Sequence, residues 1–159
     1  MTVLRYKAKC VEDGKWYEGS LLRYEDGRAR IIPTGTGIFC FEKDDKTIQV
    51  VAPYIVPESI CLCTEIADKN GNLIYENDYF KIDLYDENVE NIAVIVFNGR
   101  SFYVEWYGNT GEVMLDKDNN KTVLYECIDT NSWDDEEHII TENEIAGNII
   151  DGYPVEGMK

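Results

Sequence analysis

The sequence contains one histidine, few basic residues and no long apolar run, and each shortage argues against a class of function. Its 15 lysine and arginine residues face 31 aspartate and glutamate residues, so the formal net charge is −16. This excess of negative charge disfavours binding to nucleic acid or to an anionic membrane, because both carry dense negative charge. No segment is apolar for long enough to act as a signal peptide or to span a bilayer, which predicts a cytoplasmic protein without a membrane partner.

Catalytic and metal-binding patterns are also scarce. His138 is the only histidine, so a hydrolytic triad has no basis here. The five cysteines are odd in number and widely spread, which favours reduced, buried thiols over a disulfide framework. Cys61 and Cys63 would share one face of a strand and could join Cys10 or Cys40 in a thiolate site, but no CxxC motif supports zinc. We therefore expect no cofactor, no metal and no enzyme activity, with carboxylate catalysis as a third alternative.

Alternation of apolar and polar residues, interrupted by glycine-containing turns, is the dominant pattern and predicts an all-β protein. Asp-Gly stands between extended segments in VEDGKWYEG and RYEDGRARII, and Asn-Gly stands at the centre of VIVFNGRSFYVEW. These dipeptides predict three hairpins with type I′ turns, in which both turn residues have positive φ. Pro53 and Pro57 are expected to interrupt pairing, which predicts an N-terminal β region over residues 1–57 and a second region over 58–159.

One predicted strand carries candidate binding residues. Within SFYVEWY, Phe102, Val104 and Trp106 share one face, whereas Tyr103 and Tyr107 share the other. The hairpin partner IAVIVF is apolar on both faces, which predicts a strand that is either covered from both sides or curled inside a small barrel. We expect Tyr103 and Tyr107 to recognise a partner.

The segment DKNGNLIYENDYFKIDL places two polar turns close together. Asp68, Asn70 and Gly71 supply the first turn, residues 76–78 supply the second, and residues 73–75 form a short extended step between them. Turn chemistry explains nearly every polar position, so we interpret the motif as a folding device. A calcium loop is a remote alternative, because an EF-hand needs a longer ligand series and a closing glutamate between two helices.

With its flanks this segment reads CLCTEIADKNGNLIYENDYFKI, which resembles the signature TGLKDKNGKEIYEGDIVK of the YopX family of phage and prophage proteins. The C-terminal EIAGNIID is similar to that family's ending EVIGNIYE, and GKWYEGSLL and IIPTGTGIFCFEKDDKTI are similar to N-terminal regions of longer members. Glu65 stands where the family usually has glycine, Tyr79 and Phe80 replace an aliphatic pair, and residues 109–143 match nothing. The matching positions are Thr64, Asp68, Lys69, Asn70, Gly71, Ile74, Tyr75, Glu76, Asp78, Lys81, Glu144, Ile145, Gly147, Asn148 and Ile149.

This resemblance implies a mostly β protein encoded by a phage or prophage, with a C-terminal SH3-like small barrel preceded by a smaller β region. It also implies action in the cytoplasm of a bacterial host cell, but no established reaction. The shared residues are therefore better explained by turns and packing than by an active site. Gly71 fits a position of positive φ, and Gly147 fits a bulge or a close backbone approach.

The most negative run, TNSWDDEEHIITENE, offers a second candidate binding surface. Such runs are usually solvated loops. A more specific hypothesis is that this run forms a docking surface for a basic host protein, with an apolar anchor residue beside four carboxylates. Its residues are Trp133, Asp134, Asp135, Glu136 and Glu137.

We therefore expect a non-enzymatic interaction module that binds a host or phage protein, or a second copy of itself. The alternative is association with nucleic acid through an aromatic barrel face, which SH3-like and OB-like folds often support. That alternative requires basic residues such as Arg23, Arg28, Arg30 and Arg100 to gather on one face, away from the carboxylates.

Overall fold

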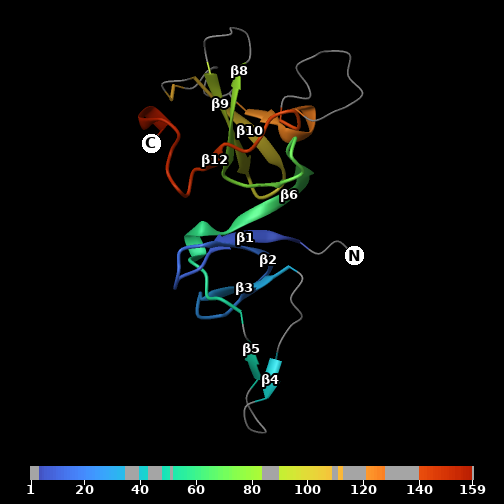
Figure 1. Cartoon of the computed structure of the whole chain (residues 1–159), viewed down its shortest axis with the longest axis vertical. Coiled ribbons are helices and arrows are strands. Elements are labelled where there is room, and N and C mark those ends of the chain that lie inside the picture. Colours follow the sequence, from blue (N-terminus) through green and yellow to red (C-terminus); the bar gives the residue numbers. More distant parts are fainter. Residues whose placement is uncertain are drawn as a thin grey trace. The chain divides into compact units, whose positions relative to one another are not determined.

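A computed structural model shows that the regular structure of the described residues consists of antiparallel strands and a few 3-10 turns (Figure 1). The structure describes residues 4–34, 40–42, 48–50, 52–83, 90–108, 111–112, 121–127 and 140–158. Within these ranges there is no α-helix, and three short 3-10 segments occur at η1 (Pro57–Ser59), η2 (Leu124–Cys127) and η3 (Glu156–Met158). The all-β prediction is therefore confirmed. No helix of the described residues is long and apolar enough to cross a membrane.

The chain divides into two compact units, which we call unit 1 (Met1–Cys63) and unit 2 (Thr64–Lys159). The predicted boundary between residues 57 and 58 lies N-terminal to this division. Nine basic and nine acidic residues fall in residues 1–63, whereas residues 64–159 contain six basic and 22 acidic residues. The whole net charge of the protein therefore resides in unit 2.

Unit 1 is a meander of β1 (Tyr6–Lys9), β2 (Trp16–Arg23) and β3 (Ala29–Pro33). Its first strand also pairs with the start of β6 (Cys61–Ala67). A separate two-stranded ribbon joins β4 (Cys40–Glu42) to β5 (Ile48–Val50). Small and branched side chains form the core of this unit: Ala8, Ala29, Ile31 and Ile55.

The proline-containing segment 53–56 takes part in pairing instead of interrupting it. On one side it bonds to β3, through the N–H of Ile31 to the Pro53 carbonyl (3.3 Å) and the N–H of Ile55 to Ala29 (3.1 Å). On the other side it pairs with the residues that follow β1, because the N–H of Val11 donates to the Tyr54 carbonyl at 2.9 Å. This segment thus links β3 to the residues that follow β1.

The three predicted hairpin turns are present, but they are not type I′. Only the glycines have positive φ, with values of 66°, 86° and 88° at Gly14, Gly27 and Gly99. The preceding aspartate or asparagine instead accepts, through its side-chain oxygen, the N–H two residues further on. The type I′ prediction was therefore wrong, because a side-chain hydrogen bond stabilises each turn without a second left-handed residue.

Unit 2 contains β7 (Leu73–Tyr75), β8 (Asp78–Asp83), β9 (Glu90–Phe97), β10 (Phe102–Tyr107), β11 (Lys121–Val123) and β12 (Gly147–Asn148). Its main sheet runs in the order β11-β10-β9-β8-β12. Strand β7 instead pairs with β6, at the end of the other five-stranded sheet, whose order is β3-β2-β1-β6-β7. The described strands of the main sheet do not close into a ring, so the expected barrel is an open sheet in this part of the chain.

The core of unit 2 lies against one face of this sheet. The core residues are Ile74, Phe80, Ile82, Ala93, Ile95, Val104, Trp106, Leu124, Cys127 and Ile140. Strand β9 is buried on both faces, since Ile92, Ala93, Val94 and Ile95 are all at most 2% exposed. This confirms the prediction drawn from IAVIVF. The four described cysteines of the chain, Cys10, Cys61, Cys63 and Cys127, are buried thiols, as expected.

Asp68 organises the first of the two adjacent turns. Its Oδ1 atom accepts the backbone N–H groups of Asn70 and Asn72, both at 2.9 Å. Its Oδ2 atom accepts the side-chain amide of Asn72 at 3.1 Å and the N–H of Ile145 at 3.2 Å. The carboxylate therefore fixes the turn and ties it to the C-terminal segment that carries EIAGNIID.

Asp78 does the same for the second turn. Its side chain is fully buried, with Oδ2 accepting the N–H of Tyr75 and Oδ1 accepting the side-chain amide of Asn148, both at 2.8 Å. The N–H of Ile149 donates to the Asn77 carbonyl at 2.9 Å. Both turns thus bind the C-terminal segment, and the polar residues of the motif serve hydrogen bonds within the fold.

Backbone geometry explains most of the glycine pattern. Gly71 has a φ of 82°, as predicted. Glu65, which stands where the family pattern has glycine, has a φ of 63°. Glu65 therefore occupies a left-handed position that glycine would tolerate better.

Gly147 is explained by a close contact. A Cβ at this position would lie only 2.6 Å from the hydroxyl oxygen of Tyr79, so glycine allows the close approach of an aromatic ring.

Candidate functional site

The two candidate tyrosines lie on the outward side of β10 and are half-buried there. Tyr107 donates its hydroxyl to Oε2 of Glu105 at 2.7 Å. Burial, followed by this hydrogen bond to a carboxylate, raises the pKa of Tyr107 well above its usual range. Tyr103 faces Val96 and Val123 in the strand register. Neither tyrosine is a freely exposed anchor, because both side chains are half-buried on β10.

The acidic candidates lie outside the described residues. These candidates are Trp133, Asp134, Asp135, Glu136 and Glu137, for which the docking hypothesis stays a prediction. Among the residues that the structure does describe, no three His, Cys, Asp or Glu side chains are grouped so that they could hold a metal ion.

Unit 2 has an apolar groove that sequence reasoning missed, and we call it the unit 2 groove. Its volume is about 290 Å³. Tyr125 is 66% exposed and Val123 is 38% exposed, so two apolar side chains of its rim face solvent. The groove is lined by Thr64, Ile66, Ser101, Phe102, Val123, Leu124 and Tyr125.

The unit 2 groove adjoins an edge strand. Strand β11 stands at the end of the sheet, and its described pairing is with β10, through Tyr103↔Val123, Val104↔Thr122 and Glu105↔Lys121. Edge strands offer backbone donors and acceptors to an added strand. The relevant residues, KTVLYEC, fall within the stretch that matches no known pattern, so only the short apolar run VLY could have indicated them.

Unit 1 has a different surface, in which cations lie over aromatic rings. The Nζ atoms of Lys7 and Lys9 lie 5.2 and 5.5 Å from the centre of the Trp16 ring. The guanidinium of Arg30 lies 3.7 Å from the centre of the Tyr54 ring. At such distances the cations are attracted to the ring faces.

A pocket of about 520 Å³ in unit 1 shares Tyr54 with this surface. Arg28 spans it, donating through Nη1 to the Tyr54 hydroxyl at 3.1 Å and through Nε to Oδ2 of Asp26 at 2.7 Å. Hydrogen bonding from Arg30, assisted by the charge of Arg28, lowers the pKa of Tyr54. The pocket is lined by Val11, Glu12, Asp26, Gly27, Arg28, Ala29, Tyr54, Ile55 and Pro57.

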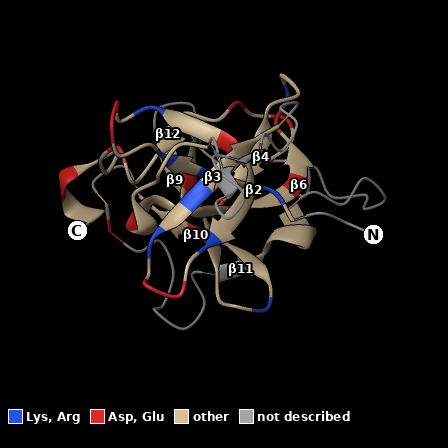
Figure 2. Cartoon of the chain, turned by 90° about the horizontal axis from the view of Figure 1, so that it is seen from below, with Lys and Arg blue, Asp and Glu red and all other residues tan. Residues whose placement is uncertain are grey.

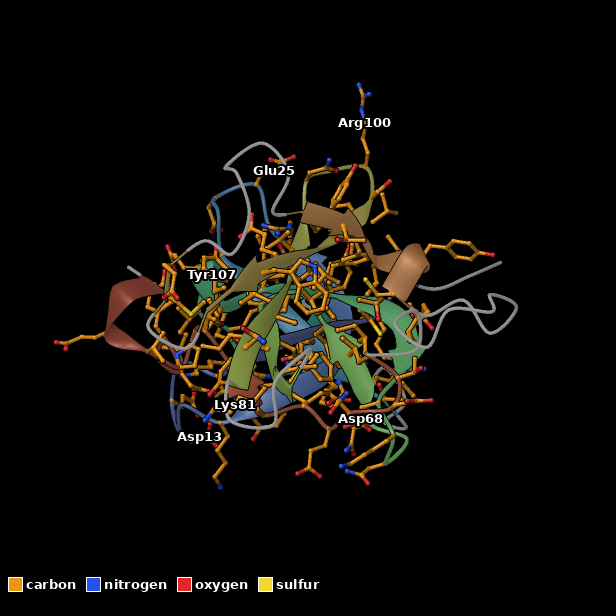
Figure 3. All side chains as sticks on the ribbon, turned by 90° about the horizontal axis from the view of Figure 1, so that it is seen from above. Asp13, Glu25, Asp68, Lys81, Arg100 and Tyr107 are labelled. Atoms are coloured by element: carbon orange, nitrogen blue, oxygen red, sulfur yellow. The ribbon has the colours of Figure 1, made fainter. Side chains whose placement is uncertain are left out.

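The structure brings together two of the arginines that the nucleic-acid alternative requires. Arg28 and Arg30 both approach the ring of Tyr54. Arg100 belongs to unit 2, where it projects from the tip of the hairpin between β9 and β10 (Figure 3). Two of the four arginines that this alternative names therefore lie together, at the ring of Tyr54 in unit 1.

Comparison with protein-family models, with curated proteins and with solved structures finds no match. The resemblance to the YopX family consequently rests on the sequence motifs alone.

Proposed function

We propose that the protein is a non-enzymatic interaction module of phage or prophage origin that binds an extended, basic segment of a protein partner in the host cytoplasm. The partner would add a strand beside β11 and place a side chain in the unit 2 groove. The observation that carries this proposal is the exposed Tyr125 at the rim of an apolar groove next to an edge strand.

Strand addition combines two sources of recognition. Main-chain hydrogen bonds to β11 would supply affinity, while alternate side chains of the added strand would reach pockets on one face. A volume of about 290 Å³ lies at the lower end of the range for small-molecule sites. The groove therefore suits one or two side chains better than a free metabolite.

Charge favours a basic partner over a second copy of the protein. Residues 64–159 contain 22 acidic and six basic residues. Two copies meeting through unit 2 would bring like charges together, whereas a basic segment would be attracted and guided to the surface. Self-association through the same edge is the alternative outcome.

An affinity pull-down from nuclease-treated bacterial lysate tests the proposal, comparing the wild-type protein with Tyr125→Ser. Truncation of an anchor residue typically costs at least about 1–2 kcal/mol, so a basic partner should be lost from Tyr125→Ser and weakened by high salt. Tyr153→Ser is a matched control, because Tyr153 is also exposed (49%) but does not line the groove.

Equal capture of the partner by wild-type, Tyr125→Ser and Tyr153→Ser proteins would contradict the groove as the binding site. Loss of all partners on nuclease treatment would contradict a protein partner. Sedimentation velocity on the wild-type protein distinguishes self-association from binding to a basic partner. Self-association would appear as a concentration-dependent dimer that Tyr125→Ser abolishes.

A further inference from the structure

One face of the unit 1 meander carries positively charged residues, although the protein as a whole is strongly acidic. Successive side chains of a strand point to opposite faces of the sheet. Ala8, Ala29 and Ile31 are buried in the core, so their neighbours Lys7, Lys9 and Arg30 lie on the other face. We call this the outer face, and it consists of Lys7, Lys9, Trp16, Glu18, Ser20, Leu22, Arg30 and Ile32.

The strand register places these side chains in adjoining rows. Lys9 is paired with Trp16, Lys7 with Glu18, and Leu22 with Arg30. The outer face therefore has three cations and one anion. Acidic residues of this unit that lie in turns include Asp13 and Asp26. Figure 2 colours the acidic residues red and the basic residues blue.

Each aromatic group on or beside the outer face is accompanied by a cation. Lys7 and Lys9 approach the Trp16 ring, and Arg30 stacks on Tyr54, which joins β3 by a bridge at Arg30. Arg30 also donates through Nη1 to the Ala52 carbonyl at 2.6 Å, which fixes its guanidinium in place. Aromatic rings interleaved with basic residues are the arrangement that binds single-stranded nucleic acid without sequence preference.

We propose that the outer face of unit 1 binds single-stranded nucleic acid, with a base stacked on Trp16 and phosphates neutralised by Lys7, Lys9 and Arg30. This site goes beyond the proposed function and does not involve the unit 2 groove. A single strand presents both a flat ring and a negative charge in each nucleotide, and the outer face presents the complement of both. An acidic peptide would engage the cations but would offer no flat base to the ring of Trp16.

Fluorescence anisotropy with fluorescein-labelled dT12 and the full-length protein tests the proposal at 50 mM salt. Stacking of one base on an aromatic residue contributes about 1–3 kcal/mol, so Trp16→Ala should weaken binding at least about fivefold, while Trp16→Tyr should retain most of it. Lys9→Gln should reduce the slope of log affinity against log salt by about 0.7, the value expected for one phosphate contact.

Arg100→Ala and Tyr125→Ser are the controls. Arg100→Ala removes a positive charge from unit 2, and Tyr125→Ser removes the anchor of the proposed protein site. Both should leave dT12 binding unchanged, so failure of this inference and failure of the proposed function are distinguishable. Circular dichroism of each variant shows whether it is folded, and Lys9→Gln keeps the test decisive if Trp16→Ala does not fold.

Three results would overturn the inference. The first is no binding of dT12 at 50 mM salt. The second is an equal loss of binding in Arg100→Ala and Lys9→Gln, which would indicate a general charge effect. The third is competition by poly-glutamate as strong as competition by unlabelled dT12, which would identify an acidic peptide as the occupant.

Discussion

Replacing Asp68 with asparagine should destabilise unit 2 by about 3 kcal/mol, although the two side chains have nearly the same shape. The wild-type carboxylate is 5% exposed and accepts four hydrogen bonds, from Asn70, Asn72 and Ile145. Asparagine could keep the two bonds at Oδ1, but its NH₂ group would then meet the donors that Oδ2 accepts. Because the N–H of Ile145 cannot reorient, at least that donor would be left without an acceptor.

The magnitude follows from the kind of bond that is lost. Hydrogen bonds to a charged group contribute about 1.5–3 kcal/mol each, and an unsatisfied buried donor costs about 1–3 kcal/mol. The side-chain amide of Asn72 can flip and offer its oxygen, so one of the two lost bonds is partly replaced. The remaining loss, centred on Ile145, gives the value of about 3 kcal/mol.

The effect should also depend on pH. Burial raises the pKa of Asp68, but the hydrogen bonds from Asn72, Ile145 and Asn70 outweigh it, so the pKa is lowered in the folded protein. A lowered pKa stabilises the fold above the unfolded value of about 3.9, and this contribution is lost as pH falls through the folded value. The difference between wild-type and Asp68→Asn should therefore shrink in acid.

Urea unfolding at pH 7, monitored by hydrogen exchange of unit 2 amides, measures the effect. Asp13→Asn is the matched control, because Asp13 accepts the N–H of Lys15 in an exposed turn where asparagine serves as well. That control should change stability by less than about 0.5 kcal/mol. A loss below about 1 kcal/mol in Asp68→Asn, or unchanged protection of the Ile145 amide, would refute the role assigned to Asp68.

Two further substitutions test the backbone geometry of unit 2. Glu65→Gly should stabilise the protein by up to about 1 kcal/mol, because a left-handed side chain costs about 1–2 kcal/mol and the added entropy of glycine about 0.5–1 kcal/mol. A lower urea midpoint would contradict this. Gly147→Ala should destabilise by about 1–3 kcal/mol, because the methyl group would overlap the ring of Tyr79. Adding Tyr79→Ala should recover part of that loss, and strictly additive effects would exclude the contact.

Local features of the fold could be predicted from the sequence, since turn residues act within a few positions. The hairpins followed from Asp-Gly and Asn-Gly, and the left-handed Gly71 followed from its turn. The buried face of β10 followed from alternation, whereas the burial of both faces of β9 followed from its continuous apolar run. Alternation of apolar and polar residues does not identify the hydrogen-bond partner of a polar group. The N–H of Ile145, for example, donates to the side chain of Asp68, which lies 77 positions earlier in the chain.

The features that were missed depend on pairing between distant segments. Pro53 and Pro57 read as breakers, yet Pro53 needs only its carbonyl to bond with β3. The unit 2 groove requires β6, β10 and η2 to meet, and no local pattern in VLY indicates that meeting. The two tyrosines of β10 were correctly placed on one face, but strand alternation gives the face and not the degree of exposure.

The distribution of charge is compatible with the two binding surfaces that we propose, which would take ligands of opposite charge. A net charge of −16 disfavours nucleic acid only if the charge is spread evenly, and residues 1–63 carry equal numbers of acidic and basic residues. Exposed charges more than about 8 Å away are largely screened at physiological salt, so a ligand on the outer face would respond mainly to the charges of that face, which are Lys7, Lys9, Arg30 and Glu18. The acidic residues of unit 2 would instead attract the basic partner that we propose. Both interactions should weaken with salt, and they can be separated because Lys9→Gln affects only the first and Tyr125→Ser only the second.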